Sequence, residues 1–295
     1  MSAGTPPRAS ALLASPGVDF LVMGVVNVTP DSFSDGGRYL DPRAAVAHGL
    51  ELEQQRASIL DIGGESTRPG APPVEVEEEL ERVVPVIEGL AAAGTRAQLS
   101  VDTAKAAVAA RAVKAGATFV NDVTALRGDP EMVGIVASSA ADCCLMHMLG
   151  DPRTMQDDPR YEDVVSEVKA FLEERLAFAT AQGIREERIM LDPGIGFGKT
   201  VEHNLELLAR IDELATLGRP VLVGSSRKSF IGRLTDRSVR DRLAGTISAN
   251  VLAYAGGARI FRVHDVAAAH DALAVAAATV RRRWTATTSQ GSSTT

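Results

Sequence analysis

The stretch FLVMGVVN, residues 20–27, shows the pattern on which the fold of this chain depends. It is an unbroken apolar run that stops at the polar amide of Asn27. A run that is apolar at every position, without alternation, suits a β-strand buried on both faces, as in a parallel sheet covered by helices. We therefore predict a strand over residues 20–26 and search the chain for others of its kind.

Seven more short apolar runs follow, and amphipathic segments separate them. The predicted strands are residues 20–26, 58–62, 97–101, 117–120, 143–146, 188–191, 221–224 and 259–263. The predicted helices are residues 41–55, 75–93, 103–114, 130–138, 162–182, 202–217, 228–234, 241–255 and 266–283. Eight β/α units without a second compositional block predict one (β/α)₈ TIM barrel. An open, doubly wound parallel sheet is the alternative that the pattern leaves.

The length of 295 residues fits this reading, because such barrels often fill about 250 residues as one domain. We expect residues 1–17 to be a loose N-terminal leader and residues 18–284 to form the barrel domain. The polar, low-complexity end, residues 285–295, is expected to be a disordered tail.

Charge and composition exclude several classes of protein. The net charge of −7 argues against a nucleic-acid binder, which needs a basic field, but leaves room for an anionic small substrate in a local basic pocket. The two adjacent cysteines, Cys143 and Cys144, are interpreted as buried thiols of a reducing compartment. No apolar run is long enough for a membrane span, and the N-terminus is too weak for a signal peptide, so we expect a cytoplasmic protein.

Polar residues stand where the predicted strands end. In a barrel these ends converge on one face, where catalytic groups sit. The residues are Asn27, Asp61, Asp102, Asn121, His147, Asp192, Ser225 and His264. Eight such residues in register are hard to attribute to solvent-facing loops, so the sequence predicts a functional site on this face.

Asp102, Asn121 and Asp192 offer carboxylates and an amide to a common centre. Such groups suit the edge of a heterocycle that carries an amino group and ring N–H groups. A carboxylate pair can instead bind a metal or act as acid and base, and the residues leave that choice open, although no His or Cys cluster lies nearby. His147 stands at the end of the fifth predicted strand and is a candidate for a functional contact, whereas the remaining histidines, apart from His264, lie on predicted helices.

Cationic residues lie beside three of the strand ends. Arg68, held between a hydroxyl and a proline, suits recognition of phosphate or carboxylate. Arg262 and His264 are spaced i, i+2 on an extended segment and therefore point the same way. With Arg68 they would make a compact anion site. Lys228 follows the seventh strand among small residues, which favours a contact with a ligand.

The glycine-rich stretch DPGIGFGKT, residues 192–200, looks like a phosphate loop. The P-loop pattern needs glycine where Pro193 stands, and the dinucleotide fingerprint fails on its third glycine. We predict a flexible loop whose backbone approaches a ligand closely, with Phe197 as an apolar or stacking wall. The loop of residues 27–37 contains Phe33 among polar residues, which suits a segment that closes over a ligand.

Eight motifs together resemble the dihydropteroate synthase family. In order along the chain they are NVTPDSFSDGG, DIGGESTRPGA, SVDT, NDV, LMHM, DPGIGFGK, GSSRKSFIG and RVHDV. The resemblance covers about residues 20–284, and eight motifs in order are far more specific than any one of them.

The resemblance implies a TIM barrel that joins 6-hydroxymethyl-7,8-dihydropterin pyrophosphate to p-aminobenzoate in folate biosynthesis. It implies that Asp102, Asn121, Asp192 and Lys228 hold the pterin, with Met146 and Arg262 packed on it. Asn27, Arg68, Arg262 and His264 would hold the pyrophosphate, with Mg²⁺ near Asn27. Thr67, Pro69, Phe33, Phe197 and Ser229 would border the p-aminobenzoate pocket, where sulfonamides compete. We assign catalysis to Asp102, Asp192, Lys228 and Arg262. The family also implies a homodimer through the last helices.

Two other functions use the same fold. A folate-binding methyltransferase domain that serves a corrinoid partner would leave Lys228, the Arg262–His264 pair and Arg68 without a role. A paralogue that binds pterin without turnover has no need of intact loops at residues 27–37 and 63–70.

One position departs from the family pattern. Arg56 and Ala57 stand before the second strand, where the family commonly has Gly-Ala. A left-handed backbone at Arg56 would cost of the order of 1 kcal/mol, far from the site.

Overall fold

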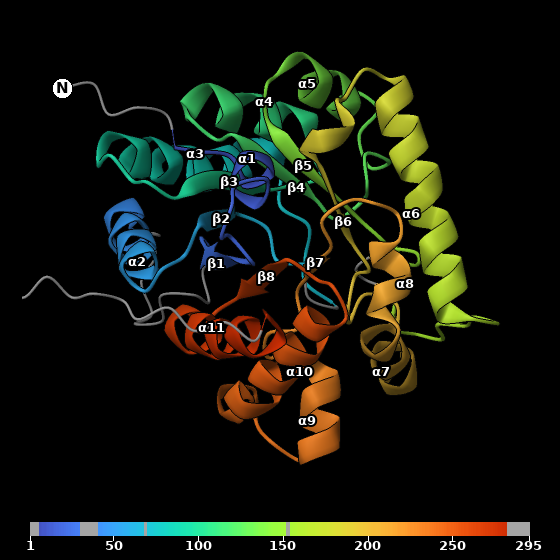
Figure 1. The fold of residues 1–295 in the computed structure, drawn as a ribbon. Coiled ribbons are helices and arrows are strands. Elements are labelled where there is room, and N and C mark those ends of the chain that lie inside the picture. Colours follow the sequence, from blue (N-terminus) through green and yellow to red (C-terminus); the bar gives the residue numbers. More distant parts are fainter. Residues whose placement is uncertain (1–5, 30–40, 68–69, 152–153, 282–295) are drawn as a thin grey trace, which may run out of the picture.

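The structure is a computed structural model that describes residues 6–29, 41–67, 70–151 and 154–281. Its strands form one parallel sheet in the order β6-β5-β4-β3-β2-β1-β8-β7 (Figure 1). A bridge between Leu191 and Val221 joins β6 to the segment before β7 and closes the barrel. The strands are β1 Leu21–Asn27, β2 Ile59–Gly63, β3 Gln98–Asp102, β4 Phe119–Asp122, β5 Asp142–Met146, β6 Ile189–Asp192, β7 Leu222–Val223 and β8 Ile260–Val263. The predicted TIM barrel is confirmed, and the open sheet is wrong.

Helices surround the strands (Figure 1). Those in the described part of the chain are α1 Ala9–Leu13, α2 Pro42–Gln54, α3 Val76–Ala92, α4 Ala106–Ala115, α5 Met132–Ser138, α6 Val164–Ala181, α7 Val201–Ala209, α8 Ile211–Ala215, α9 Ser229–Thr235, α10 Leu243–Ala255 and α11 Val266–Arg281. The predicted helix 202–217 is two helices, because the backbone of Arg210 leaves the helical region. The Arg210 side chain binds Asp163, Glu206 and Glu213 there.

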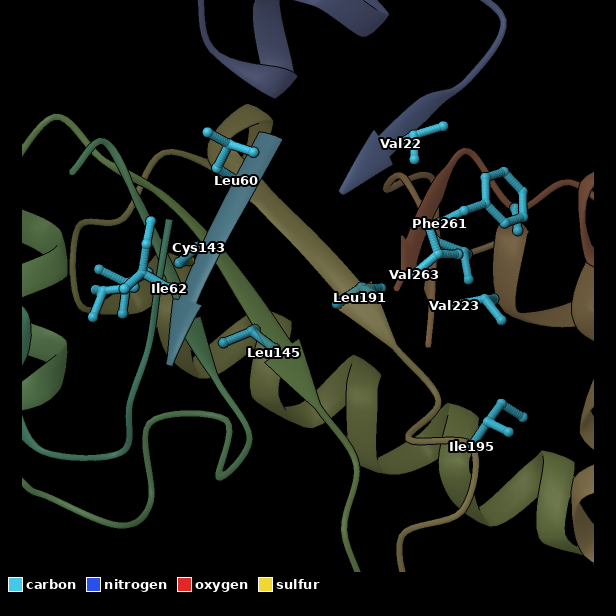
Figure 2. Packing of buried hydrophobic residues seen from close by; sticks show 14 of the residues in the cluster. Val22, Leu60, Ile62, Cys143, Leu145, Leu191, Ile195, Val223, Phe261 and Val263 are labelled. Atoms are coloured by element: carbon cyan, nitrogen blue, oxygen red, sulfur yellow. The ribbon is translucent and has the colours of Figure 1, made fainter. Parts of the chain in front are cut away.

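Successive residues of each strand face opposite sides of the barrel wall. The outward side chains pack against the helices in one continuous cluster. Figure 2 shows part of this layer, with Val22, Leu60, Ile62, Leu145, Leu191, Val223, Phe261 and Val263 labelled on their strands. The inward side chains form a second, separate cluster that includes Met23, Ile59, Phe119, Cys144, Met190, Leu222 and Ile260. This second cluster fills the lower barrel, so the interior is a packed core and not a pore.

On several strands, the inward residue two positions after the apolar one is polar. Ile59, Phe119, Met190 and Ile260 are followed at this spacing by Asp61, Asn121, Asp192 and Arg262. Since side chains two apart on a strand share a face, these polar groups lie directly above the apolar layer. The inward apolar cluster therefore lies directly beneath the polar strand ends, and we call it the apolar floor of the site.

The leader that the sequence predicted to be loose is not loose where the structure describes it. Ala9 of α1 is fully buried and joins the inward apolar cluster. Its backbone N–H donates to Gln98 Oε1 at 2.6 Å, and the Ser10 hydroxyl donates to Asp142 at 2.8 Å. Helix α1 therefore covers the amino-terminal end of the barrel. The lower boundary of the barrel domain stays a prediction, and its upper boundary and the tail fall in residues 282–295, outside the described part.

Both cysteines are buried and unpaired, as expected. Burial raises the pKa of the Cys143 thiol to about 12, so this group is an unreactive core residue. Within the described residues, no helix has the length and apolar character needed to cross a membrane.

The backbone of Arg56 is left-handed, with φ of 78°, at the turn between α2 and β2. We predict that Arg56→Gly stabilises the protein by about 0.5–1 kcal/mol, because glycine adopts this conformation without a steric penalty. Thermal unfolding would measure the gain. The matched control is Arg111→Gly within α4, which should destabilise by about 1 kcal/mol. Equal destabilisation by both changes would contradict a strained backbone at Arg56.

Candidate functional site

A cavity opens at the carboxyl ends of the strands, above the apolar floor. It is lined by Thr67, Asp102, Asn121, Val123, Met146, Asp192, Gly194, Ile195, Phe197, Gly224, Lys228 and Arg262. Eight of these are residues that the sequence analysis proposed as a binding or catalytic group. They come from positions up to 195 residues apart, and the barrel brings them together because every strand ends on this face.

Arg262 of β8 is held by two carboxylates. Its Nε donates to Asp61 Oδ2 at 2.6 Å, and its Nη2 donates to Asp102 Oδ2 at 2.6 Å. Burial by itself lowers the pKa of Arg262, but Asp61 and Asp102 outweigh it and raise that pKa above its usual range. The guanidinium is therefore a fixed positive charge with a fixed orientation in the cavity wall.

Asp61 is a site residue that sequence reasoning did not assign, although it was noted as a polar strand end. It is fully buried and also accepts hydrogen bonds from Ser100 Oγ at 2.6 Å and Asn121 Nδ2 at 3.0 Å. Asp61 thus orients both Arg262 and Asn121 from beneath. Its inward position between Ile59 and Gly63 was the available signal.

Two carboxyl groups that line the cavity, Asp102 and Asp192, are costly to ionise. Burial raises the pKa of Asp102 to about 7, even though the Arg262 guanidinium acts in the opposite direction. Burial likewise raises the pKa of Asp192 to about 6, although the Gly194 N–H and the Lys228 ammonium act to lower it. The Gly194 N–H donates to Asp192 Oδ1 at 2.7 Å. Both groups gain from any ligand that brings them hydrogen-bond donors or positive charge.

Lys228 and Phe197 meet across the cavity. The Lys228 Nζ lies 3.9 Å from the centre of the Phe197 ring, which is a cation–π contact. The preceding residue, Arg227, has a left-handed backbone and is held by Asp265 through two hydrogen bonds of 3.0 and 2.6 Å. The loop after β7 therefore presents Lys228 in a defined direction.

Other predicted site residues lie outside this cavity. His264 is half-buried and pairs through Nδ1 with Ser226 Oγ at 3.0 Å. Ser229 is exposed at the start of α9. His147 is buried against Lys199 and Phe171 and does not line the cavity. Phe33, Arg68 and Pro69 fall outside the described residues, so the predicted grouping of Arg68 with Arg262 and His264 is not described.

Asn27 ends β1 on the same face and is half-buried. Its side-chain amide has no hydrogen-bond partner among the described residues. In that same part of the chain, no group of three or more His, Cys, Asp or Glu side chains is arranged to hold a metal. A single amide oxygen fits a magnesium ion that takes most of its ligands from water and a substrate phosphate.

The raised pKa of Asp192 gives a prediction about stability. A carboxyl group with a raised pKa favours folding below the unfolded-state value of about 4, and this contribution is lost as pH rises through about 6. Asp192→Asn should therefore stabilise the protein at pH 8 by up to about 3 kcal/mol in urea unfolding and lose this advantage below pH 4. The exposed control Asp212→Asn should leave the free energy of unfolding at pH 8 nearly unchanged. A pH-independent effect of Asp192→Asn would contradict the raised pKa.

Comparison with known proteins gives consistent matches over the barrel. A family model described as pterin binding enzyme matches residues 23–264. The dihydropteroate synthase of Escherichia coli K12 is 46% identical over 259 residues, which are 88% of this chain and 91% of that protein. The dihydropteroate synthase of Xanthomonas albilineans, solved with 4-aminobenzoic acid, has a TM-score of 0.83 and 53% identity, covering 88% of this chain and 93% of that one.

The Yersinia pestis dihydropteroate synthase, solved with a sulfonamide drug complex, has a TM-score of 0.84 and 43% identity. That match covers 88% of this chain and 94% of the Yersinia chain. Each match covers most of this chain and most of the relative. The similarity therefore extends over the complete fold and is not limited to one motif. The chain therefore belongs to the pterin-binding enzymes and, within them, to the dihydropteroate synthase family.

Proposed function

We propose that this chain is a transferase that joins 6-hydroxymethyl-7,8-dihydropterin pyrophosphate to p-aminobenzoate, giving 7,8-dihydropteroate and pyrophosphate. The observation that carries the proposal is the gathering of Asp102, Asn121, Asp192, Lys228 and Arg262 around one cavity. The membership of the family and the ligand named for the Xanthomonas structure support the choice of substrates.

The pterin ring is the substrate part whose donors and acceptors match the polar groups that line the cavity. Its amino group and ring N–H can donate to Asp192 and Asn121, and Lys228 can donate to its carbonyl oxygen. The buried Asp192 gains most from such donors, since its ionised form has lost most of its hydration. Met146 and the flat Arg262 guanidinium line the cavity beside these groups and are proposed to pack on the ring.

The chemistry is displacement of pyrophosphate from the pterin methylene by the aniline nitrogen. Electron release from the pterin ring builds positive charge as the leaving group departs, and the carboxylates of Asp102 and Asp192 favour that charge. No Ser–His or Cys–His pair is present among the residues that line the cavity, which agrees with a reaction that needs no covalent enzyme intermediate.

Pyrophosphate is proposed to lie at the rim, toward Asn27, Arg68, Arg262 and His264. Asn27 would hold a magnesium ion, which when bound supplies charge that stabilises the leaving pyrophosphate. The chain's own residues supply a further fixed positive charge at Arg262, and His264 is oriented by the Ser226 hydroxyl.

The p-aminobenzoate pocket is proposed beside Thr67, Phe197 and Ser229, completed by Phe33 and Pro69. The sulfonamide in the Yersinia structure supports inhibition of this chain by the same class of drug. Closure of the loops at residues 27–37 and 63–70 would exclude water, which otherwise hydrolyses a cationic intermediate.

We also propose a homodimer formed through α10 and α11. Leu252, Val275 and Val280 are apolar yet 61%, 68% and 61% exposed on these neighbouring helices. Exposed large apolar side chains on two adjacent helices favour a protein partner over solvent. The cytoplasm is the proposed location, since two unpaired thiols suit a reducing compartment.

The proposed reaction is tested by pyrophosphate release from the purified chain. We expect release that requires both the pterin pyrophosphate and p-aminobenzoate together with magnesium, and that a sulfonamide inhibits in competition with p-aminobenzoate. Absence of release with all components present would contradict the synthase. In that case, a methyl-transfer assay and calorimetry with pterin would separate the corrinoid methyltransferase from a binding-only paralogue.

A further inference from the structure

The loop after β6 is held in place, contrary to the flexible loop that its glycines predicted. Three successive backbone carbonyls each accept a hydrogen bond from a different side chain. Gln156 Nε2 donates to Gly196 at 2.7 Å, Lys199 Nζ to Phe197 at 3.0 Å and Tyr161 Oη to Gly198 at 2.8 Å. The left-handed glycines give this loop its shape, and these donors fix it.

Lys199 differs from the other two donors because it is a buried cation. Its side chain is 3% exposed, and its second hydrogen bond joins Nζ to His147 Nδ1 at 3.0 Å. Burial and the charge of Lys199 lower the pKa of His147 to about 2, so the imidazole is neutral. Burial also lowers the pKa of Lys199 itself to about 7. Within the described residues, its hydrogen-bond partners are thus both uncharged.

A buried lysine without a carboxylate on its ammonium is costly to the fold. A lysine retained for stability alone would be expected to bind a carboxylate directly, as Lys105 does with Glu65 and Glu79. Lys199 instead has two consequences for the cavity. It fixes the backbone of Phe197, which lines the wall. It also lies beside Asp192, because its partner His147 donates its backbone N–H to the Asp192 carbonyl at 2.9 Å, and its charge acts to lower the pKa of Asp192.

We propose that Lys199 is a positioning residue of the site, which holds the Phe197 wall through its carbonyl and favours the ionised form of Asp192 through its charge. This inference rests on the proposed function, in which Phe197 borders the p-aminobenzoate pocket and Asp192 binds the pterin. Within the described part of the chain, the cations whose charge acts on Asp192 are Lys228 from the loop after β7, Arg262 from β8 and Lys199 from its own loop. Lys199 is the one among these three that does not line the cavity.

Three variants separate the two effects of Lys199. Lys199→Met removes both the hydrogen bond and the charge, Lys199→Gln keeps an N–H donor without the charge, and Tyr161→Phe removes the neighbouring bond to Gly198 without changing any charge. Thermal unfolding first identifies the variants that are folded. Steady-state kinetics then give kcat and KM for p-aminobenzoate, and calorimetry gives the affinity for dihydropteroate, both between pH 5 and 9.

For Lys199→Met we expect kcat/KM to fall about ten- to a hundred-fold, mainly through a higher KM for p-aminobenzoate, because Phe197 is displaced. The pH at which dihydropteroate affinity is half lost on the acid side should rise by roughly half a unit to one unit. Lys199→Gln should recover part of the KM but keep the shifted midpoint. Tyr161→Phe should keep the midpoint of the wild-type chain.

An unchanged midpoint in both Lys199 variants would overturn the electrostatic role, and an unchanged KM in Lys199→Met would overturn the positioning of Phe197. A midpoint shift in Tyr161→Phe equal to that of Lys199→Met would mean that any loosening of the loop has this effect. If the wild-type chain binds dihydropteroate but does not catalyse the reaction, the proposed function is contradicted. The pH midpoints of dihydropteroate binding in the variants still decide whether Lys199 acts on Asp192.

Discussion

Desolvation of the polar strand ends by the apolar layer beneath them is the constraint on which this site depends. In a closed parallel barrel, every second side chain of a strand points inward. A polar residue two positions after an inward apolar residue therefore lies directly above the packed apolar layer. Asp61 above Ile59 and Asp192 above Met190 follow this rule. Water cannot reach these carboxylates from below, and their charges must be balanced by protein or ligand.

The protein balances these charges incompletely. Arg262 compensates Asp61 and Asp102 together, so two carboxylates share one guanidinium in a buried place. Burial leaves the pKa values of Asp102 and Asp192 raised to about 7 and about 6. Apolar residues at these positions would make the fold more stable, so the buried carboxyl groups are a cost of the site to the fold. Under the proposed function, a pterin that donates hydrogen bonds to Asp102 and Asp192 would compensate the carboxyl groups that the protein itself compensates least.

The eight strands and the face that carries the site were predictable from the sequence, because continuous apolar runs and their polar ends are local signals. The roles of Asp61 and Arg262 toward each other were not, since these residues are 201 positions apart. Nothing in the sequence distinguishes Lys199 from a solvated lysine, because its burial against His147 depends on tertiary packing. Helix α1 was missed because its few apolar residues gain stability from the barrel end and not from their own periodicity. The division of residues 202–217 lies at Arg210, whose ion pair with Asp163 of a distant segment is not a local signal either.

The central claim is that the buried carboxylates accept hydrogen bonds from the pterin in their ionised form. Calorimetry of dihydropteroate binding at about pH 6, in buffers of different ionisation enthalpy, measures the protons exchanged on binding. Because the ligand donors favour ionised Asp192 and Asp102, we expect protons to be released on binding and this release to decline above pH 8. Proton uptake, or binding without proton exchange at pH 6, would contradict it.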